Sequence, residues 1–176
     1  MSGGILFRKE KCGVRETHPI APVFDADSRI LILGSFPSVK SRETMFFYGH
    51  PQNRFWRVTA AVFGTEVPQS IPEKRAFLLA NHIAVWDVIA SCEIVGSSDS
   101  SIRDVVPNDL SEILKTAQIQ TIFTNGGTAA KYYAKYQLPR TGIPAVTLPS
   151  TSPANAAWTL QRLKEAWQAI KIPTER

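Results

Sequence analysis

The stretch Arg29-Ile-Leu-Ile-Leu-Gly34 is a short apolar run that leads directly into a loop rich in glycine, serine and proline. An apolar run bounded in this way is typical of a parallel strand that is buried on both faces. Three further segments have strand character, at 83–89, 119–124 and 145–148. The sequence therefore predicts a sheet of four strands.

The segments between these strands have the apolar spacing of helices. This spacing predicts helices over about 55–63, from Pro72 onward, around 129–136 and, as the longest, over 154–170. Asn108 is predicted to cap one further helix. Because strands and helices alternate, we predict an α/β fold, a three-layer αβα arrangement with a central, mainly parallel four-stranded sheet.

The chain of 176 residues has the length of one domain. We predict an irregular N-terminal leader over residues 1–24 and a single domain over 25–173. The composition, 44% hydrophobic and 20% charged, is that of a globular protein. No apolar run approaches the roughly 20 residues that cross a membrane, and residues 1–11 lack the pattern of a signal peptide. We therefore expect no membrane partner and a cytoplasmic location.

Cysteine and histidine residues are few and scattered. Cys12 and Cys92 have neither the spacing of a disulfide framework nor that of metal ligands, and the 3 histidines are equally dispersed. We therefore predict no metal site.

Basic residues gather in one part of the chain. The net charge is +5, and residues 29–57 hold five basic side chains against the single acid Glu43, whereas 82–112 hold six acids against Arg103 alone. This imbalance suits a polyanionic partner held on one face of the molecule. An ordinary solvated basic surface explains the same distribution equally well.

Three unusual loops follow predicted strands, at 34–51, 125–127 and 149–155. Because ligands of parallel sheets collect where the carboxyl ends of the strands open into loops, we expect these loops to form the site. The first loop sets the aromatic residues 46–48 beside a basic, amide-rich helix start, which suits stacking on nucleic-acid bases. Taken without further information, packing of these rings into the core is the better interpretation.

Two long motifs change that balance. Gly34-Ser-Phe-Pro-Ser38, followed by Tyr48-Gly-His-Pro-Gln-Asn-Arg-Phe-Trp56, resembles the first motif of the uracil-DNA glycosylase superfamily and, within it, the hypoxanthine-DNA glycosylase branch. Leu148-Pro-Ser-Thr-Ser-Pro-Ala-Asn155 resembles the second signature of the superfamily, which enters the DNA helix. Residues 86–89 and 97–101 also fit this branch, so the resemblance covers residues 29 to about 160.

The resemblance implies a cofactor-free, monofunctional enzyme that flips hypoxanthine out of double-stranded DNA and hydrolyses its glycosidic bond, leaving an abasic site. Phe36 stands where many relatives have an Asp or Asn that positions the attacking water. In the branch that the sequence resembles, this role is associated with the amide of the His-Pro-x-Asn segment, so the resemblance implies that the amide oxygen of Asn53 orients the water. Tyr48 would stack on the flipped base and Asn125 would read its edge. The predicted base-binding residues are Gly34, Ser35, Phe36, Tyr48 and Asn125.

The remaining motif residues are predicted to bind the DNA around the lesion. The third loop would press into the gap left by the base, and hydroxyls, amides and cations would hold the flanking phosphates. This predicted DNA-binding set is Ser38, Lys40, His50, Arg54, Ser150, Thr151, Ser152, Pro153 and Asn155.

Several assignments stay open in the sequence. Asp87 can orient water or simply end its strand, and His50 can contact DNA or only shape its loop. The serines at 97–101 suit either a phosphate or a polar turn. The alternatives for the whole chain are a mismatch-specific uracil or thymine glycosylase, which shares the His-Pro-x-Asn-Arg-Phe-Trp segment, and a non-catalytic module that binds damaged DNA. A free-nucleoside enzyme is a weaker alternative, and we expect a monomer.

Overall fold

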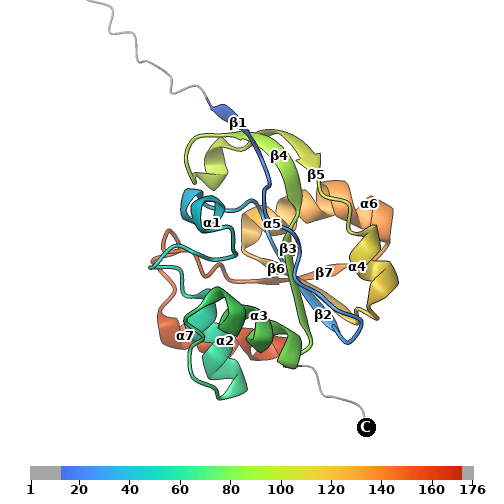
Figure 1. Ribbon diagram of the computed structural model, residues 1–176. Helices are drawn as coiled ribbons and strands as arrows, with labels where there is room; N and C mark the ends of the chain where they lie inside the picture. The colour runs from blue at the N-terminus through green and yellow to red at the C-terminus, as the bar shows by residue number, and fades with distance from the viewer. Residues whose placement is uncertain (1–12, 172–176) are drawn as a thin grey trace, which may run out of the picture.

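The computed structural model describes residues 13–171. At its centre lies a sheet of four parallel strands in the order β3-β2-β6-β7. The strands are β2 (Ile30–Gly34), β3 (Ile83–Asp87), β6 (Thr121–Asn125) and β7 (Ala145–Leu148). The predicted four-stranded parallel sheet is confirmed, and Figure 1 shows it running through the middle of the molecule.

The two faces of this sheet bury alternate residues of each strand, as the period of a β-strand requires. Ile30 and Ile32 of β2 belong to one apolar cluster, and Leu31 and Leu33 belong to the other. The first cluster packs under α2 (Phe55–Phe63), α3 (Ile71–Ala80) and α7 (Leu160–Ala166), which Figure 1 shows grouped together. Helices α4 (Ser111–Thr116) and α5 (Gly127–Tyr132) contribute to the second cluster.

A second, antiparallel sheet, which was not predicted from the sequence, also contributes to that cluster. It consists of β1 (Val14–Thr17), β4 (Ile89–Ile94) and β5 (Arg103–Pro107) in the order β1-β4-β5. Two predictions are thereby corrected. The leader is not irregular throughout, since 14–17 forms a strand, and the segment predicted as one strand over 83–89 breaks after β3 and enters β4 in the other sheet.

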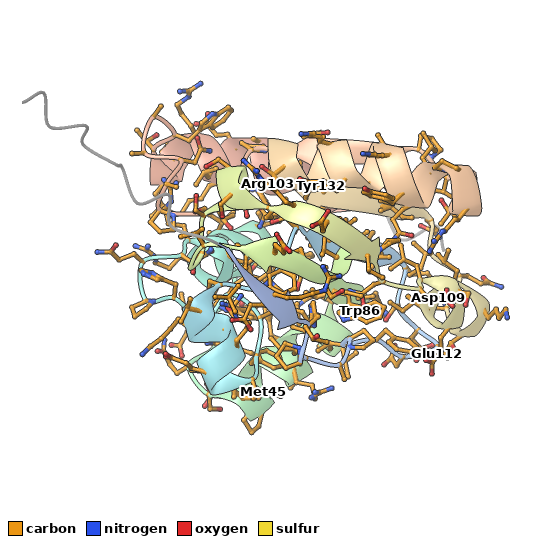
Figure 2. All side chains as sticks on the ribbon, turned by 90° about the horizontal axis from the view of Figure 1, so that it is seen from above. Met45, Trp86, Arg103, Asp109, Glu112 and Tyr132 are labelled. Carbon is orange, nitrogen blue, oxygen red and sulfur yellow. The ribbon has the colours of Figure 1, made fainter. Side chains whose placement is uncertain are left out.

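Helix α5 is tied to this antiparallel layer. The Tyr132 hydroxyl donates to the carbonyl of Ile102, the residue before β5. Figure 2 labels Tyr132 beside Arg103, at the start of that strand. The antiparallel sheet and the helices thus form one continuous cover over the second face of the parallel sheet.

Two helix predictions were wrong in detail. Asn108 caps no helix, because its side-chain amide donates to the carbonyls of Asp87 and Ile89 where the chain changes sheets. The long C-terminal helix is shorter than predicted: α7 begins at Leu160, capped by Thr159, and residues 154–159 form turns. The remaining helical segments are α1 (Val39–Thr44), α6 (Leu138–Thr141), a π-helical segment η2 (Tyr133–Gln137) and the 3-10 segments η1 (Asp99–Ser101) and η3 (Trp167–Ile170).

The carboxyl ends of the four parallel strands meet at one rim. Gly34 pairs with Asp87 and Asn125 pairs with Leu148 in the strand register, so these residues lie side by side where the loops begin. Arg29 precedes β2 and therefore lies at the opposite edge, which removes it from any basic surface shared with this rim. Within residues 13–171, no helix is both long and apolar enough to cross a membrane.

Candidate active site

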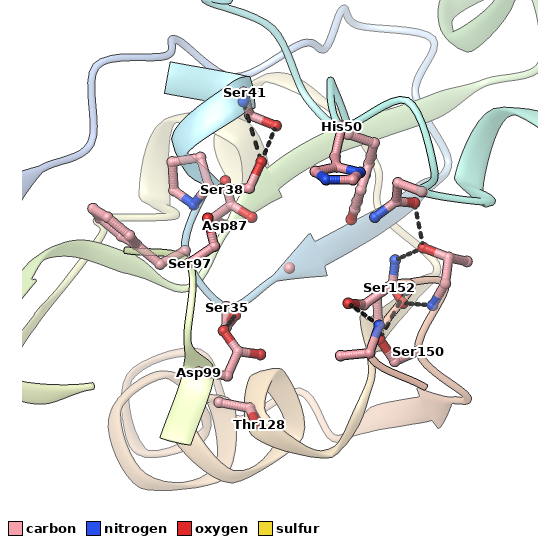
Figure 3. A pocket seen from close by; sticks show the side chains of 18 of the residues that line it. Ser35, Ser38, Ser41, His50, Asp87, Ser97, Asp99, Thr128, Ser150 and Ser152 are labelled. Carbon is pink, nitrogen blue, oxygen red and sulfur yellow. Dashed lines mark hydrogen bonds between the residues drawn. The ribbon is translucent and has the colours of Figure 1, made fainter. Parts of the chain in front are cut away.

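A cavity of about 650 Å³ opens at this rim. Its size is that of a small-ligand site. The first loop, the third loop, the turn at 97–100 and the ends of β2, β3 and β6 line it together, and Figure 3 shows it from close by. Twelve of the predicted site residues line the cavity: Gly34, Ser35, Phe36, Ser38, Tyr48, His50, Asn53, Asn125, Ser150, Thr151, Ser152 and Pro153. Lys40, Arg54 and Asn155 do not.

One wall of the cavity is a chain of hydrogen bonds through Asn125, Thr151 and Asn53. Asn125 Oδ1 accepts from the Thr151 backbone N–H at 3.0 Å, and Asn53 Oδ1 accepts from the Phe55 N–H at 2.9 Å. A backbone N–H can only donate, so both amide orientations are fixed. Asn125 Nδ2 then donates to Thr151 Oγ1, which donates in turn to Asn53 Oδ1, each at 2.9 Å. We call these three residues the amide wall.

The amide wall corrects the predicted role of Asn53. Its oxygen already accepts two hydrogen bonds, from Phe55 at the start of α2 and from the fully buried Thr151. An amide oxygen has two lone pairs, so it is not free to orient a water. No residue between 13 and 171 accepts a hydrogen bond from Asn53 Nδ2. Asn53 therefore offers the cavity N–H donors instead of an acceptor.

Tyr48 places an aromatic ring in the cavity. The ring stacks on Phe55 with 3.9 Å between centroids, so only its other face remains for a base. Its backbone is left-handed, with φ 52°, an uncommon conformation for a residue other than glycine. Its buried hydroxyl makes no hydrogen bond within the described residues. Burial, with a contribution from the negative charge of Asp87, raises the pKa of Tyr48 above its ordinary value; nearby Asn125 opposes the shift but forms no well-aligned hydrogen bond.

Arg54 has a different position from the predicted phosphate contact. Its guanidinium donates to the carbonyl oxygens of Ser152, Asn155 and Trp158, and its backbone N–H donates to that of Thr151. These acceptors all belong to the third loop and the turns after it. The side chain therefore holds this segment against the start of α2, and its hydrogen-bonding groups face inward instead of toward DNA.

The third loop is further shaped by its own polar groups. Asn155 Nδ2 donates to the Ser150 carbonyl, Ser150 Oγ accepts from the Ser152 N–H, and Ser152 Oγ accepts from the Ala154 N–H. The tip at Pro153 and Ala154 is exposed and borders the cavity. The loop thus presents a small apolar tip on a hydrogen-bonded base.

The first loop carries the other predicted DNA contacts. Ser38 caps α1 by accepting from the Ser41 N–H, and its hydroxyl also contacts Ser41 Oγ. Lys40 is half exposed and pairs with Glu43 at 3.4 Å. His50 Nδ1 accepts a backbone hydrogen bond within its own loop, and the ring borders the cavity.

Two carboxylates, Asp87 and Asp99, reach the cavity from the side opposite Ser150 and Ser152 (Figure 3). Asp99, in the turn at 97–101, accepts from Ser35 Oγ at 3.0 Å. Partial loss of hydration raises the pKa of Asp99; the Ser35 hydroxyl lowers it, and the negative charge of Asp87 raises it further. Asp87, at the end of β3, contacts His18 Nε2 at 2.7 Å.

Two glycines allow close approaches that a side chain would prevent. A Cβ on Gly34 would lie 2.4 Å from Asp87 Oδ1, so glycine is needed for this carboxylate to sit beside β2. Gly126 has φ 95°, and a Cβ there would lie 2.9 Å from the Cβ of Ser150. Glycine at 126 therefore lets the third loop approach the end of β6.

Comparison with known proteins identifies the family. The family described as the uracil DNA glycosylase superfamily matches residues 21–171, most of the chain. The chain belongs to the uracil-DNA glycosylase superfamily. Among relatives of this superfamily member, a protein named hypoxanthine DNA glycosylase from Methanosarcina acetivorans is 35% identical over 150 residues, 84% of this chain and 93% of the relative.

Two further comparisons agree with this membership. A Methanosarcina barkeri protein, also named hypoxanthine DNA glycosylase, is 33% identical over 149 residues, 83% of this chain and 92% of that protein. The solution NMR structure of a Methanosarcina acetivorans protein, provisionally named a uracil DNA glycosylase, superposes with a TM-score of 0.72 at 30% identity. That alignment covers 87% of this chain and 97% of the other.

Phe36 makes its part of the cavity wall apolar. Phe36 is buried, and the Arg42 guanidinium lies 5.4 Å from its ring centroid.

His18 was not predicted as a site residue, because it falls in the segment that was predicted to be an irregular leader. The nearby apolar residues Ile20 and Val23, both buried in the structure, were the signal that this segment packs against the domain. Within residues 13–171, no group of three or more His, Cys, Asp or Glu side chains is placed to hold a metal ion.

Proposed function

We propose that this protein is a monofunctional DNA glycosylase that removes hypoxanthine from double-stranded DNA. The observation that carries the proposal is the amide wall, whose hydrogen-bond directions leave N–H donors of Asn53 available at the cavity. The two relatives named hypoxanthine DNA glycosylase, which align with most of this chain, support the same substrate.

Donor groups suit hypoxanthine better than adenine. Hypoxanthine, like guanine, presents O6 and N7 acceptors along one edge, whereas adenine presents an N6 amino donor beside N7. N–H groups of Asn53 and Asn125 that bind a carbonyl oxygen would face the adenine amino group donor to donor. The unmodified base would therefore lose a hydrogen bond and leave polar groups unpaired.

The same donors assist cleavage. Breaking the glycosidic bond leaves negative charge on the departing base, and fixed N–H groups stabilise that charge without reorganising. Flipping the base costs a few kcal/mol, and stacking on the free face of Tyr48 would return about 1–3 kcal/mol. Among residues 13–171, no lysine lines the cavity. We therefore infer hydrolysis by water, without a Schiff base and without strand cleavage.

The loops around the cavity supply the proposed DNA contacts. The exposed tip at Pro153 and Ala154 would enter the gap left by the flipped base. Ser38, Lys40 and His50 lie on the neighbouring first loop, where they would meet the phosphates on one side of the lesion. We further propose that the protein acts in the cytoplasm as a monomer.

A direct test uses end-labelled duplexes with a single deoxyinosine, a deoxyuridine or a guanine–thymine mismatch, followed by alkaline cleavage at abasic sites. The matched control duplex carries deoxyadenosine at the same position. Breakage at deoxyinosine alone is expected. Breakage only at uracil or thymine would place the chain with the mismatch-specific enzymes, and tight binding without breakage would indicate a damage-binding module. Trapping of a covalent complex with borohydride would contradict the monofunctional reaction.

A further inference from the structure

Asp87 is a buried carboxylate that the function proposed above does not use. Its side chain is 6% exposed, yet it lines the cavity. Oδ2 contacts His18, whereas Oδ1 accepts no hydrogen bond from any residue between 13 and 171. Buried charged groups normally have hydrogen-bond partners, because burial of a charge without a partner costs roughly several kcal/mol. Asp87 Oδ1 is thus an acceptor available to a ligand.

His18 fixes which carboxylate oxygen is available. The Ile20 backbone N–H donates to His18 Nδ1 at 3.1 Å, so this nitrogen carries no proton. The ring proton therefore lies on Nε2, which donates to Asp87 Oδ2. The His18 side chain is 2% exposed, and the rings of Phe36, Phe47 and Trp86 lie about 6 Å from it. His18 therefore holds the carboxylate in one orientation.

The backbone around Asp87 is equally well held. Asn108 Nδ2 donates to the Asp87 and Ile89 carbonyls, and Gln137 Nε2 donates to the carbonyls of Val88 and Asn108. Both amide side chains are buried. Asp87 is thus placed by two layers of buried hydrogen bonds, which is the support that a preorganised catalytic group requires.

A second polar atom without a partner lies beside Asp87 Oδ1. The position that a Cβ would take on Gly34 is 2.4 Å from Asp87 Oδ1 and 3.4 Å from Tyr48 Oη. The two oxygens therefore converge on one side of Gly34, and neither has a hydrogen-bond partner among the described residues. A carboxylate oxygen and a hydroxyl that lie on the same side of a glycine are the kind of polar partners that hold a water.

We propose that Asp87 Oδ1 and the Tyr48 hydroxyl hold the attacking water, that Asp87 accepts its proton, and that His18 is a positioning residue for Asp87. The proposal rests on the glycosylase function and adds the group that activates water. The water oxygen bonds to C1′, and the bond from C1′ to the base breaks with its electron pair remaining on the base. One water proton passes to Asp87, and the departing base gains one proton from the solvent as Asp87 releases its own.

The charge of Asp87 suits the same step. Cleavage develops positive charge on the sugar, and a carboxylate with little solvent around it interacts strongly with that charge. The amide wall, by contrast, supplies donors to the base. No polar side chain is then needed at position 36 to activate the water, because the carboxylate of Asp87 reaches the cavity from β3 instead of from the first motif.

The test measures single-turnover cleavage and binding separately for Asp87→Asn. Binding is measured on a duplex with 2′-fluoro-2′-deoxyinosine, whose fluorine disfavours positive charge on the sugar and blocks cleavage. Asparagine keeps the size of the side chain and an oxygen that accepts from His18, but it takes no proton. We expect the rate to fall by about 100- to 10,000-fold and the affinity to change by less than about threefold. Asp99→Asn, which removes a charge from the same cavity, is the matched control and should slow cleavage by less than about fivefold.

Two further measurements keep the proposal falsifiable if Asp87→Asn folds poorly. Formate should raise the cleavage rate of Asp87→Ala, because a small carboxylate can replace the missing one, and it should not raise that of Asn53→Ala. His18→Gln, whose side-chain N–H can still reach Asp87, should retain more activity than His18→Leu at equal affinity for the fluorinated duplex.

An Asp87→Asn rate within about threefold of the unmodified protein would overturn the proposal, as would the absence of formate rescue in a folded Asp87→Ala. The glycosylase function fails in a different way. If the unmodified protein cuts deoxyuridine and not deoxyinosine, the substrate assignment is wrong, and the Asp87 variants are then compared on deoxyuridine.

Discussion

The two sides of the cavity are built in opposite ways. In the amide wall, backbone N–H groups fix the directions of all hydrogen bonds, and the groups left over are N–H donors. On the other side, His18 and Asp87, which we call the carboxylate wall, leave an oxygen acceptor. Glycosidic cleavage needs this polarity, with donors where the base gains negative charge and an acceptor where water loses a proton. The difference indicates that the two walls act on different groups in the same step, one on the base and one on the water.

Apart from the Asp87 variants, the largest expected effect comes from removing the N–H donors of Asn53 in the amide wall. Asn53→Asp keeps an oxygen for Phe55 and Thr151 but loses the N–H groups, so cleavage should slow by about 100- to 1,000-fold. Asn53→Ala also loses the hydrogen bond at the start of α2. It should therefore lower the free energy of unfolding by ~1 kcal/mol, whereas Asn53→Asp should leave it unchanged. Single-turnover rates and urea unfolding of both variants check this.

Gln52→Glu is the control for the charge that Asn53→Asp introduces. It adds the same charge one residue earlier, on an exposed side chain. Its rate at saturating enzyme should stay close to that of the unmodified protein. A cleavage rate for Asn53→Asp as high as this control would mean that the N–H groups play no part, and the comparison of the two walls would lose its first half.

The next prediction concerns how much Arg54 stabilises the segment that carries Thr151 of the amide wall. Arg54→Gln removes charge-assisted hydrogen bonds to three carbonyls and should lower the free energy of unfolding by about 2–3 kcal/mol. Arg57→Gln, an exposed neighbour on α2, should change it by less than about 0.5 kcal/mol. Urea unfolding measures both.

The salt dependence of DNA binding separates this role of Arg54 from the phosphate contact predicted from sequence. Lys40→Ala should reduce the slope of log affinity against log salt by about 0.9, as expected for one lost phosphate contact. Arg54→Gln should leave the slope unchanged. An equal reduction of the slope in both variants would show that Arg54 contacts a DNA phosphate, as predicted from the sequence.

Tyr48→Phe tests the junction between the two walls with a smaller effect. The hydroxyl is buried and has no hydrogen-bond partner among residues 13–171, so if no water binds it, its removal should raise the free energy of unfolding by about 1 kcal/mol. If the hydroxyl holds water beside Asp87, cleavage should slow by roughly tenfold, the equivalent of one hydrogen bond. A variant that is more stable and equally fast would remove Tyr48 from the water site while leaving its ring available for stacking.

The smallest effect concerns Asp99, which neither wall uses. Its folded-state pKa is raised, so Asp99 contributes stability below the ordinary value of 3.8 and loses that contribution as pH rises through the folded value. Asp99→Asn should therefore be slightly more stable than the unmodified protein at neutral pH, and the difference should shrink below pH 3.8. Urea unfolding at both conditions gives the sign; a larger difference at acid pH would contradict it.

The two walls also differ in how far the sequence predicts them. The four parallel strands follow from apolar runs that end in loop residues, and the amide wall lies in motifs whose resemblance is specific. The direction of the Asn53 amide does not follow, because it depends on which backbone N–H groups meet it in the folded chain. The apolar residues Ile20 and Val23 indicate that the segment with His18 packs on the domain, but its contact with Asp87 does not follow from the sequence, because short strands such as 14–17 pair over long sequence distances. The same holds for Asn108, whose capping pattern is overridden by a tertiary contact.

Combining a variant from each wall tests the central claim most directly. Single-turnover rates on the deoxyinosine duplex are measured for Asn53→Asp, Asp87→Asn and the double variant. Groups that act independently on the same transition state, one at the base and one at the water, should lose rate independently, so the double variant should be slower by the product of the two losses, within about threefold. A double variant no slower than the slower single variant would show that both residues act as one unit, and would contradict the division of labour between the two walls.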